Sequence, residues 1–129
     1  MTQKTAAFAF YRAKCTNIRW SWSALSVGGS VVLGLWRDEF DDPKTLKNYS
    51  TNDAIIDDWK DRKGNKERIK HLVLVRDKLR GEFKRIIMIA SDENARVRRM
   101  KHCYADSSVK MRLTTFDETT GAFKAVRID

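Results

Sequence analysis

The chain of 129 residues has few of the residues that interrupt or cross-link a fold, with one proline, six glycines and two cysteines. Cys15 and Cys103 form no C-x-x-C pair, which favours buried thiols in a reducing cytoplasm over a disulfide or a zinc site. His71 and His102 have no ligand-like spacing either. No apolar run approaches the roughly 20 residues of a membrane span, and the N-terminal segment is too short and too aromatic for a signal peptide. We therefore expect a cytoplasmic protein with no metal, no cofactor and no membrane partner.

Strong catalytic signatures are missing as well. The chain contains no P-loop, no G-x-S-x-G, no H-E-x-x-H and no HNH-like or zinc-like histidine cluster. No internal repeat or low-complexity segment is present. We therefore predict no catalytic residue and favour a binding module over an enzyme.

The chain combines an excess of positive charge with the composition of a globular protein. Lysine and arginine number 26 against 17 aspartates and glutamates, which gives a net charge of +9, and 42% of the residues are hydrophobic. The length predicts one domain, residues 1–129, with a real core. An excess of this size favours a polyanionic partner, because neutralising phosphates drives sequence-independent binding.

Two β-rich runs around Gly28-Gly29 are typical of a tight hairpin. If these glycines are the two loop residues, Trp22 faces Leu35 and Trp20 faces Arg37. Side chains alternate across a strand, so this register sorts the hairpin into two faces. The face we expect in the core carries Trp20, Trp22, Ala24, Val31, Leu33 and Leu35.

The opposite face of the hairpin is the candidate site. It carries Arg19, Ser21, Ser23, Gly34, Trp36 and Asp38. A glycine lets a ligand approach the strand, an indole offers a stacking plane, and the remaining groups form hydrogen bonds. A one-residue slip would exchange the two faces, and the predicted base pocket also includes Trp20 and Trp22.

The rest of the chain predicts alternating helices and strands. Residues 4–15 fit a first strand or a short helix, and residues 41–52 a loop. Thr51 or Asn52 is expected to cap a short helix over 53–59, and Asn65 a longer one that stops at Gly81, with a strand over 71–75 as the alternative. Strands are expected over 83–90, 109–116 and 122–128, with a short helix after Asp92. The fold class is α+β, a small curved mixed β-sheet or open barrel with two or three flanking helices.

Basic residues gather late in the chain. The predicted phosphate-binding set is Arg96, Arg98, Arg99, Lys101, Lys110 and Arg112. A second basic group is interspersed with acidic residues and is interpreted as a solvated helix face: Lys60, Arg62, Lys63, Lys66, Arg68 and Lys70.

The acidic residues after the hairpin have two interpretations. Asp38, Glu39 and Asp42 are candidate ligands for Mg²⁺ in a small nuclease or toxin. Alternatively, Asp38 in a stacking pocket accepts a hydrogen bond from an exocyclic amine such as cytosine N4.

Three ordered motifs resemble a group of poorly characterised bacterial proteins. They are R-W-S-W-x-A at residues 19–24, W-x-D-E at 36–39 and E-R-x-x-H at 67–71. Domains of this size and strand order also look like the PUA superfamily, which includes EVE, ASCH, YTH and SRA-type readers. That resemblance implies a small curved barrel that takes a modified or flipped base into an aromatic pocket, and in several cases a nuclease partner in modification-dependent restriction.

The sequence thus favours a nucleic-acid-binding module that reads modified, flipped bases, with DNA preferred over RNA. A nuclease partner chain or domain in restriction or phage defence is part of this hypothesis. The alternatives are the metal-dependent nuclease or toxin and a PUA-like RNA-binding protein.

Overall fold

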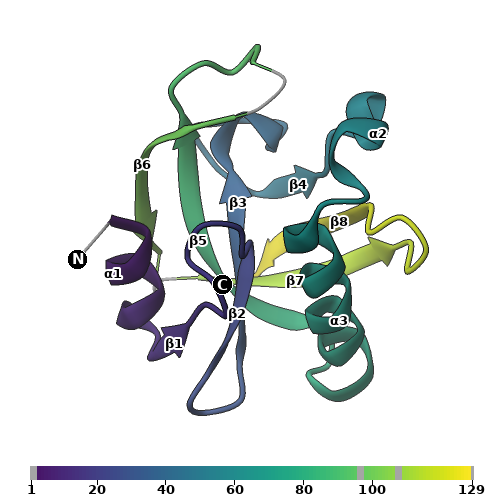
Figure 1. Cartoon of the computed structure of the whole chain (residues 1–129). Coiled ribbons are helices and arrows are strands. Elements are labelled where there is room, and N and C mark those ends of the chain that lie inside the picture. The colour runs from purple at the N-terminus through teal and green to yellow at the C-terminus, as the bar shows by residue number, and fades with distance from the viewer. Residues whose placement is uncertain (1–2, 96–97, 107–108, 129) are drawn as a thin grey trace.

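The computed structural model describes residues 3–95, 98–106 and 109–128, and it has the predicted α+β class. Figure 1 shows the elements in chain order. The helices are α1 (Gln3–Phe10), α2 (Ile56–Trp59) and α3 (Lys63–Lys78), with 3-10 turns at Arg37–Glu39 and Asp53–Ile55. The strands are β1 (Ala13–Lys14), β2 (Ser23–Ser26), β3 (Val31–Trp36), β4 (Asn48–Ser50), β5 (Glu82–Ala90), β6 (Met100–Ala105), β7 (Lys110–Phe116) and β8 (Phe123–Ile128). None of the helices in the described ranges is long and apolar enough to cross a membrane.

The strands form one mixed, open sheet built around β5. Its order is β1-β2-β3-β5-β7-β8-β4, and β6 pairs with β5 beside β7. The β3–β5 pair is parallel, whereas the other pairs are antiparallel. Along the edge away from β3, the first residues of β5 pair with β7 and its last residues pair with β6. The sheet therefore curves and divides at β5, which agrees with the predicted curved sheet.

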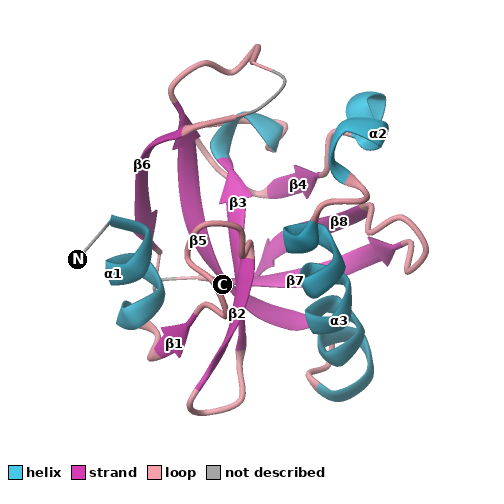
Figure 2. Ribbon diagram, in the orientation of Figure 1, coloured by secondary structure: helices cyan, strands magenta, loops and turns pink. Residues whose placement is uncertain are grey.

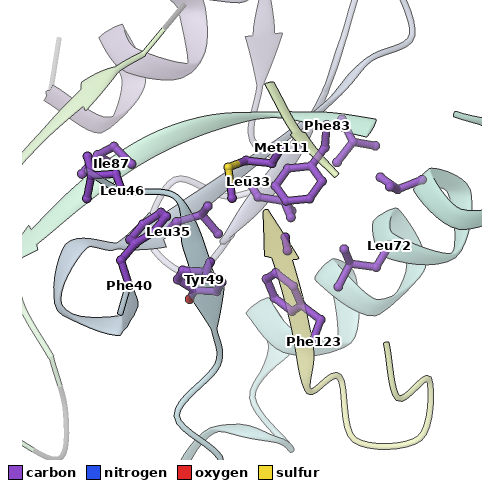
Figure 3. Packing of buried hydrophobic residues seen from close by; sticks show 13 residues of the cluster. Leu33, Leu35, Phe40, Leu46, Tyr49, Leu72, Phe83, Ile87, Met111 and Phe123 are labelled. Carbon is purple, nitrogen blue, oxygen red and sulfur yellow. The ribbon is translucent and has the colours of Figure 1, made fainter. Parts of the chain in front are cut away.

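Helices flank the sheet on two sides, with α1 on the left of Figure 2 and α3 on the right. On the α3 side, Leu33, Leu35 and Ile87 pack with Leu72 and Phe123 in the larger core (Figure 3). On the α1 side, Val32, Ile86 and Met88 pack with Phe8 in a smaller core. The central strands β3 and β5 are buried on both faces, which explains their long apolar runs.

The hairpin of β2 and β3 forms, but the predicted register is wrong by one residue. Ser23 lies opposite Leu33 and Ala24 opposite Val32, and the loop has three residues between Ser26 and Ser30. Gly29 has a φ of +89°, the left-handed conformation that a three-residue hairpin loop takes at this position. The Ser26 side chain accepts a hydrogen bond from the Ser30 N–H at 2.9 Å and helps to close the longer loop.

This slip exchanges the two predicted faces of the segment around β2, whereas the predicted core residues of β3, Val31, Leu33 and Leu35, are buried as expected. Ser21 and Ser23 are fully buried, whereas Trp20 and Trp22 are half-buried. Ser23 Oγ shares a 2.5 Å hydrogen bond with Nδ1 of His71 on α3. The Ser21 hydroxyl accepts a 3.1 Å hydrogen bond from the Asn17 N–H. The expectation of serines in a pocket and tryptophans in the core is therefore wrong, because the parity of the loop decides which face of β2 points inward.

The helix α3 confirms one predicted end and corrects the other. Gly81, with a φ of +78°, follows its last turn and donates its N–H to the Val75 carbonyl at 2.8 Å, so the predicted stop is confirmed. Residues 71–75 are helical, so the alternative strand is wrong. The helix begins at Lys63, and Asn65 lies inside the first turn rather than capping it.

The bounds of the other helices and strands are also confirmed in part and corrected in part. Strands β5, β7 and β8 lie where they were predicted, and residues 4–15 contain both a helix and a short strand. The predicted loop 41–52 contains β4, and Asn52 makes no side-chain cap on the turn that precedes α2. Within the described residues, no helix follows Asp92. The Asp92 side chain instead accepts a hydrogen bond from the Asn94 N–H at 2.9 Å, within a turn.

Candidate functional site

All four tryptophans of the chain line one cavity of about 720 Å³. They come from the segment before β2, the end of β3 and α2, and they are Trp20, Trp22, Trp36 and Trp59. Figure 1 shows the end of β3, the start of β6 and α2 in the upper half of the view. The cavity is a concave site with several flat apolar planes and charged groups between them, the composition expected of a ligand pocket.

The first turn of α3 fixes one wall of this tryptophan cavity. A Cβ built on Gly64 would lie 2.5 Å from the Trp20 carbonyl oxygen and 2.6 Å from the Trp22 ring. Gly64 therefore permits the helix to pack directly against these residues. On another wall, Trp59 donates its indole N–H to the Asn52 carbonyl at 3.0 Å, which orients that ring.

Trp36 forms a further wall together with a basic side chain. The Arg98 guanidinium lies 5.3 Å from the centre of the Trp36 ring and forms a bidentate ion pair with Asp38. The Asp38 hydrogen bond raises the pKa of Arg98, so the group is charged. Arg98 also donates to the Glu93 carbonyl at 3.0 Å. The predicted neighbours Trp36 and Asp38 do lie together, but Asp38 binds Arg98 and does not line the cavity.

Arg68 is the charged group that the sequence interpretation placed wrongly. The residue was assigned to a solvated helix face, yet it is 5% exposed and lines the tryptophan cavity. Its guanidinium carbon lies 4.9 Å from the centre of the Trp22 ring and 5.5 Å from that of Trp59. Nη2 donates to Asn65 Oδ1 at 3.1 Å, whereas Nε is buried without a hydrogen-bond partner. Burial lowers the pKa of Arg68, but an arginine stays protonated in proteins.

Glu39 supplies a negative group to the same cavity. One carboxylate oxygen accepts from the Tyr49 hydroxyl and the other from the Asn52 N–H at 3.1 Å. Burial raises the pKa of Glu39, while the hydrogen bond from Tyr49 and the charge of Arg68 oppose that rise. Its sequence pattern indicated only a metal ligand, because the position of Glu39 beside the tryptophans depends on contacts that are distant in the sequence.

The remaining pocket candidates divide between the cavity and the core. Arg19 and Gly34 line the cavity together with Trp20, Trp22 and Trp36, whereas Ser21 and Ser23 do not. The space expected above Gly34 is partly filled by Met88, since a Cβ on Gly34 would lie 2.9 Å from the Met88 sulfur. Five of the eight predicted pocket residues are therefore brought together.

The predicted phosphate-binding residues lie in two places. Arg98, Arg99 and Lys101 adjoin the last residues of β5, and Arg98 lines the cavity. Lys110 and Arg112 lie beside the first residues of β5, about 25 Å away along the strand. Arg96 is outside the described residues. The five described residues therefore do not gather in one place, and only Arg98 of this set lines the cavity.

The carboxylates of the nuclease alternative do not converge. Asp38 pairs with Arg98, Glu39 binds Tyr49 and Asn52, and Asp42 accepts from the Lys44 N–H at 2.9 Å. Over the described ranges, no group of three or more histidine, cysteine, aspartate or glutamate side chains is arranged to hold a metal ion. Because each carboxylate of the trio has its own protein partner, the geometry does not support the predicted metal site.

Charge around the tryptophan cavity is mixed, with an excess of basic groups. Among the described residues, six basic side chains line it against three acidic ones: Lys4, Arg19, Arg62, Lys63, Arg68 and Arg98 against Glu39, Asp58 and Asp61. This arrangement can stack a flat ring, form directed hydrogen bonds to it and attract a negative group at the rim. Comparison of the chain with protein-family models, with curated proteins and with solved structures gives no match, so the site is interpreted from its own geometry.

Proposed function

We propose that this protein is a nucleic-acid-binding module that takes one extruded base into the tryptophan cavity. The observation that carries the proposal is the convergence of all four tryptophans on one cavity beside a buried arginine and a carboxylate. Every base has a π-face, and stacking on an aromatic side chain contributes roughly 1–3 kcal/mol per base. That gain offsets part of the few kcal/mol that unstacking a base costs.

Charge separates this proposal from another use of aromatic pockets, the capture of quaternary ammonium ligands. In this cavity the Arg68 guanidinium already lies over the Trp22 and Trp59 rings, and basic lining groups outnumber acidic ones. A second cation would be repelled. A neutral base followed by phosphates matches this charge distribution, as does the net charge of +9.

The preferred ligand within this proposal is a modified base in DNA. The cavity volume of about 720 Å³ lies in the roughly 300–1,000 Å³ range of small-molecule pockets, so a base with an added substituent has room. The motif resemblance and the small curved sheet with flanking helices agree with a PUA-like reader. Such a module would act in modification-dependent restriction or phage defence together with a nuclease on a partner chain or domain.

A pair of alanine variants tests the stacking role. We expect Trp36→Ala to weaken binding of a short oligonucleotide by about tenfold or more, because it removes one stacking plane. Phe10→Ala is the matched control, since Phe10 is 60% exposed and does not line the cavity. Fluorescence anisotropy measures both affinities, and equal affinities for wild type and Trp36→Ala would contradict the proposal.

A panel of ligands tests the preferred substrate. One duplex carries plain, methylated, hydroxymethylated or glucosylated cytosine, or methylated adenine, at a single position, and its RNA equivalent is measured in parallel. We expect one modified DNA to bind more tightly than the plain duplex. Equal binding of all the DNA duplexes would remove the reader function, and tighter binding of the RNA would favour the RNA-binding alternative.

A further inference from the structure

Arg68 is held in place by contacts that leave most of its donors unused. Asn65 Oδ1 accepts from Nη2, and the Asn65 amide is itself fixed by donating to the carbonyls of Lys60 and Thr120, both at 2.8 Å. The Phe123 ring, 5.1 Å from the guanidinium carbon, supports the group from the core side. A guanidinium has five N–H donors and no acceptor. The protein therefore orients a donor group within the cavity wall without pairing most of it.

No carboxylate among the described residues forms an ion pair with Arg68, although its guanidinium is almost completely buried. Buried polar groups in native proteins nearly always have partners, and an exception calls for a physical reason. Arg68 Nε is such an exception, since it has no hydrogen-bond partner. A ligand acceptor in the cavity would give the guanidinium, which lines the cavity, a partner that the protein does not supply.

Glu39 provides hydrogen-bond acceptors that complement the donors of Arg68. Its two oxygens each accept one hydrogen bond from the protein, from Tyr49 and Asn52, and an ionised carboxylate has about four acceptor positions. Acceptor capacity therefore remains on a group that lines the same cavity as Arg68. A donor-only group and an acceptor-only group are fixed in one aromatic cavity.

We propose that Arg68 and Glu39 together read the hydrogen-bonding edge of the base that the tryptophans stack. Arg68 donates to a carbonyl oxygen or ring nitrogen of the ligand, and Glu39 accepts from an N–H of the same heterocycle. This inference rests on the proposed function and adds to it, because the tryptophans supply affinity for any flat ring whereas this pair selects among rings. A site built to form hydrogen bonds discriminates strongly against ligands that leave its buried groups unpaired.

The test uses an oligonucleotide duplex with one unpaired position that carries adenine, cytosine, guanine, thymine or an abasic sugar. We expect the wild-type protein to bind the tightest base-bearing probe at least tenfold more strongly than the abasic one. Arg68→Lys keeps the charge but loses the planar set of donors, so binding of the base-bearing probes should fall at least tenfold while abasic binding stays the same.

Glu39→Gln supplies the second arm, and it has nearly the same shape as the wild-type side chain. An amide both donates and accepts, so we expect the order of preference among the four bases to change. Glu118→Gln is the matched control, because it makes the same change at an exposed residue that does not line the cavity and should leave the order unchanged. Thermal unfolding establishes that each variant is folded, and Glu39→Gln decides the question if Arg68→Lys does not fold.

The outcomes separate this inference from the function on which it rests. If Glu39→Gln keeps the wild-type order of bases while Trp36→Ala still weakens binding, the edge-reading role is overturned and the stacking function stands. If the wild-type protein binds the abasic probe as tightly as every base-bearing probe, both the proposed function and the inference fail.

Discussion

Two arginines are buried among the residues that the structure describes, and their surroundings differ. Arg85, on β5, is 1% exposed, pairs with Asp106 at 2.7 Å and donates to the Leu46 carbonyl at 2.6 Å. Arg68, on α3, is 5% exposed and has aromatic rings in place of a counter-ion. The guanidinium of Arg85 is used within the fold, whereas that of Arg68 keeps unpaired donors at a cavity.

The difference indicates how to separate structural from ligand-binding charges in a basic chain. A buried charge that the protein itself pairs contributes to the fold, and breaking the pair leaves an uncompensated partner. A buried charge that the protein orients without pairing is available to a ligand. By this criterion the region around β5 and Asp106 is structural, and the first turns of α3 with the four tryptophans form the proposed binding region.

The largest effect is expected at Arg85. The substitution Arg85→Met removes the guanidinium that pairs with Asp106 and donates to the Leu46 carbonyl. The free energy of unfolding should therefore fall by about 3–5 kcal/mol. Chemical denaturation measures this change. A fall of less than about 1 kcal/mol would contradict the comparison, because Arg85 would then contribute no more to stability than Arg68.

The matched substitution Arg68→Met should cost much less stability. It removes the hydrogen bond to Asn65 and the contacts with the aromatic rings, while a buried unpaired donor disappears with it, so we expect a loss of about 1–2 kcal/mol. The same denaturation experiment applies. A loss equal to that of Arg85→Met would show that Arg68 also serves the fold.

The hydrogen-bonded pair of buried Ser23 and half-buried His71 gives a pH-dependent prediction for the structural side of the comparison. Burial lowers the pKa of His71 from its ordinary value of 6.5, so the folded protein holds the ring neutral. The unfolded chain then binds the extra proton first, and stability present above pH 6.5 is lost as the pH falls through the folded pKa. Denaturation at a series of pH values should show this loss in the wild type and a smaller one in His71→Gln. Parallel pH profiles for the two proteins would contradict it.

The smallest effect concerns the two basic groups at opposite ends of β5. If nucleic acid binds at the tryptophan cavity, Arg99→Ala should lower the slope of log affinity against log salt by about 1, as the loss of one phosphate contact does. Arg112→Ala, at the far end, should leave the slope unchanged. Titrations at several salt concentrations measure both slopes, and the reverse result would place the binding surface away from the cavity.

Much of the fold could be predicted because its strongest signals are local. The apolar run of β5, the turn between β7 and β8 and the stop at Gly81 each depend on a few neighbouring residues. The hairpin register could not be predicted in this way. A two-residue and a three-residue loop both fit Gly28-Gly29, and the choice between them decides which side of β2 is buried.

The site was predicted in part for related reasons. Trp36 was singled out because an indole offers a stacking plane, whereas the register that was assumed placed Trp20 and Trp22 on the core face. Arg68 was missed because its neighbours in sequence are charged. Its position four residues before buried Leu72 nevertheless places it on the inward side of α3, and this spacing was the available signal. The contact of Trp59 with the Arg68 guanidinium depends on how α2 packs against α3, and no short sequence pattern predicts it.

The central claim, that the four-tryptophan cavity is the base-binding site, is tested most directly by fluorine NMR of protein labelled with 5-fluorotryptophan. The chain has four tryptophans, so four resonances are expected, all from the cavity. The account predicts that an oligonucleotide with an unpaired base shifts them and that the matching abasic oligonucleotide leaves them nearly in place. Binding of the base-bearing oligonucleotide with no change in any of the four resonances would contradict it.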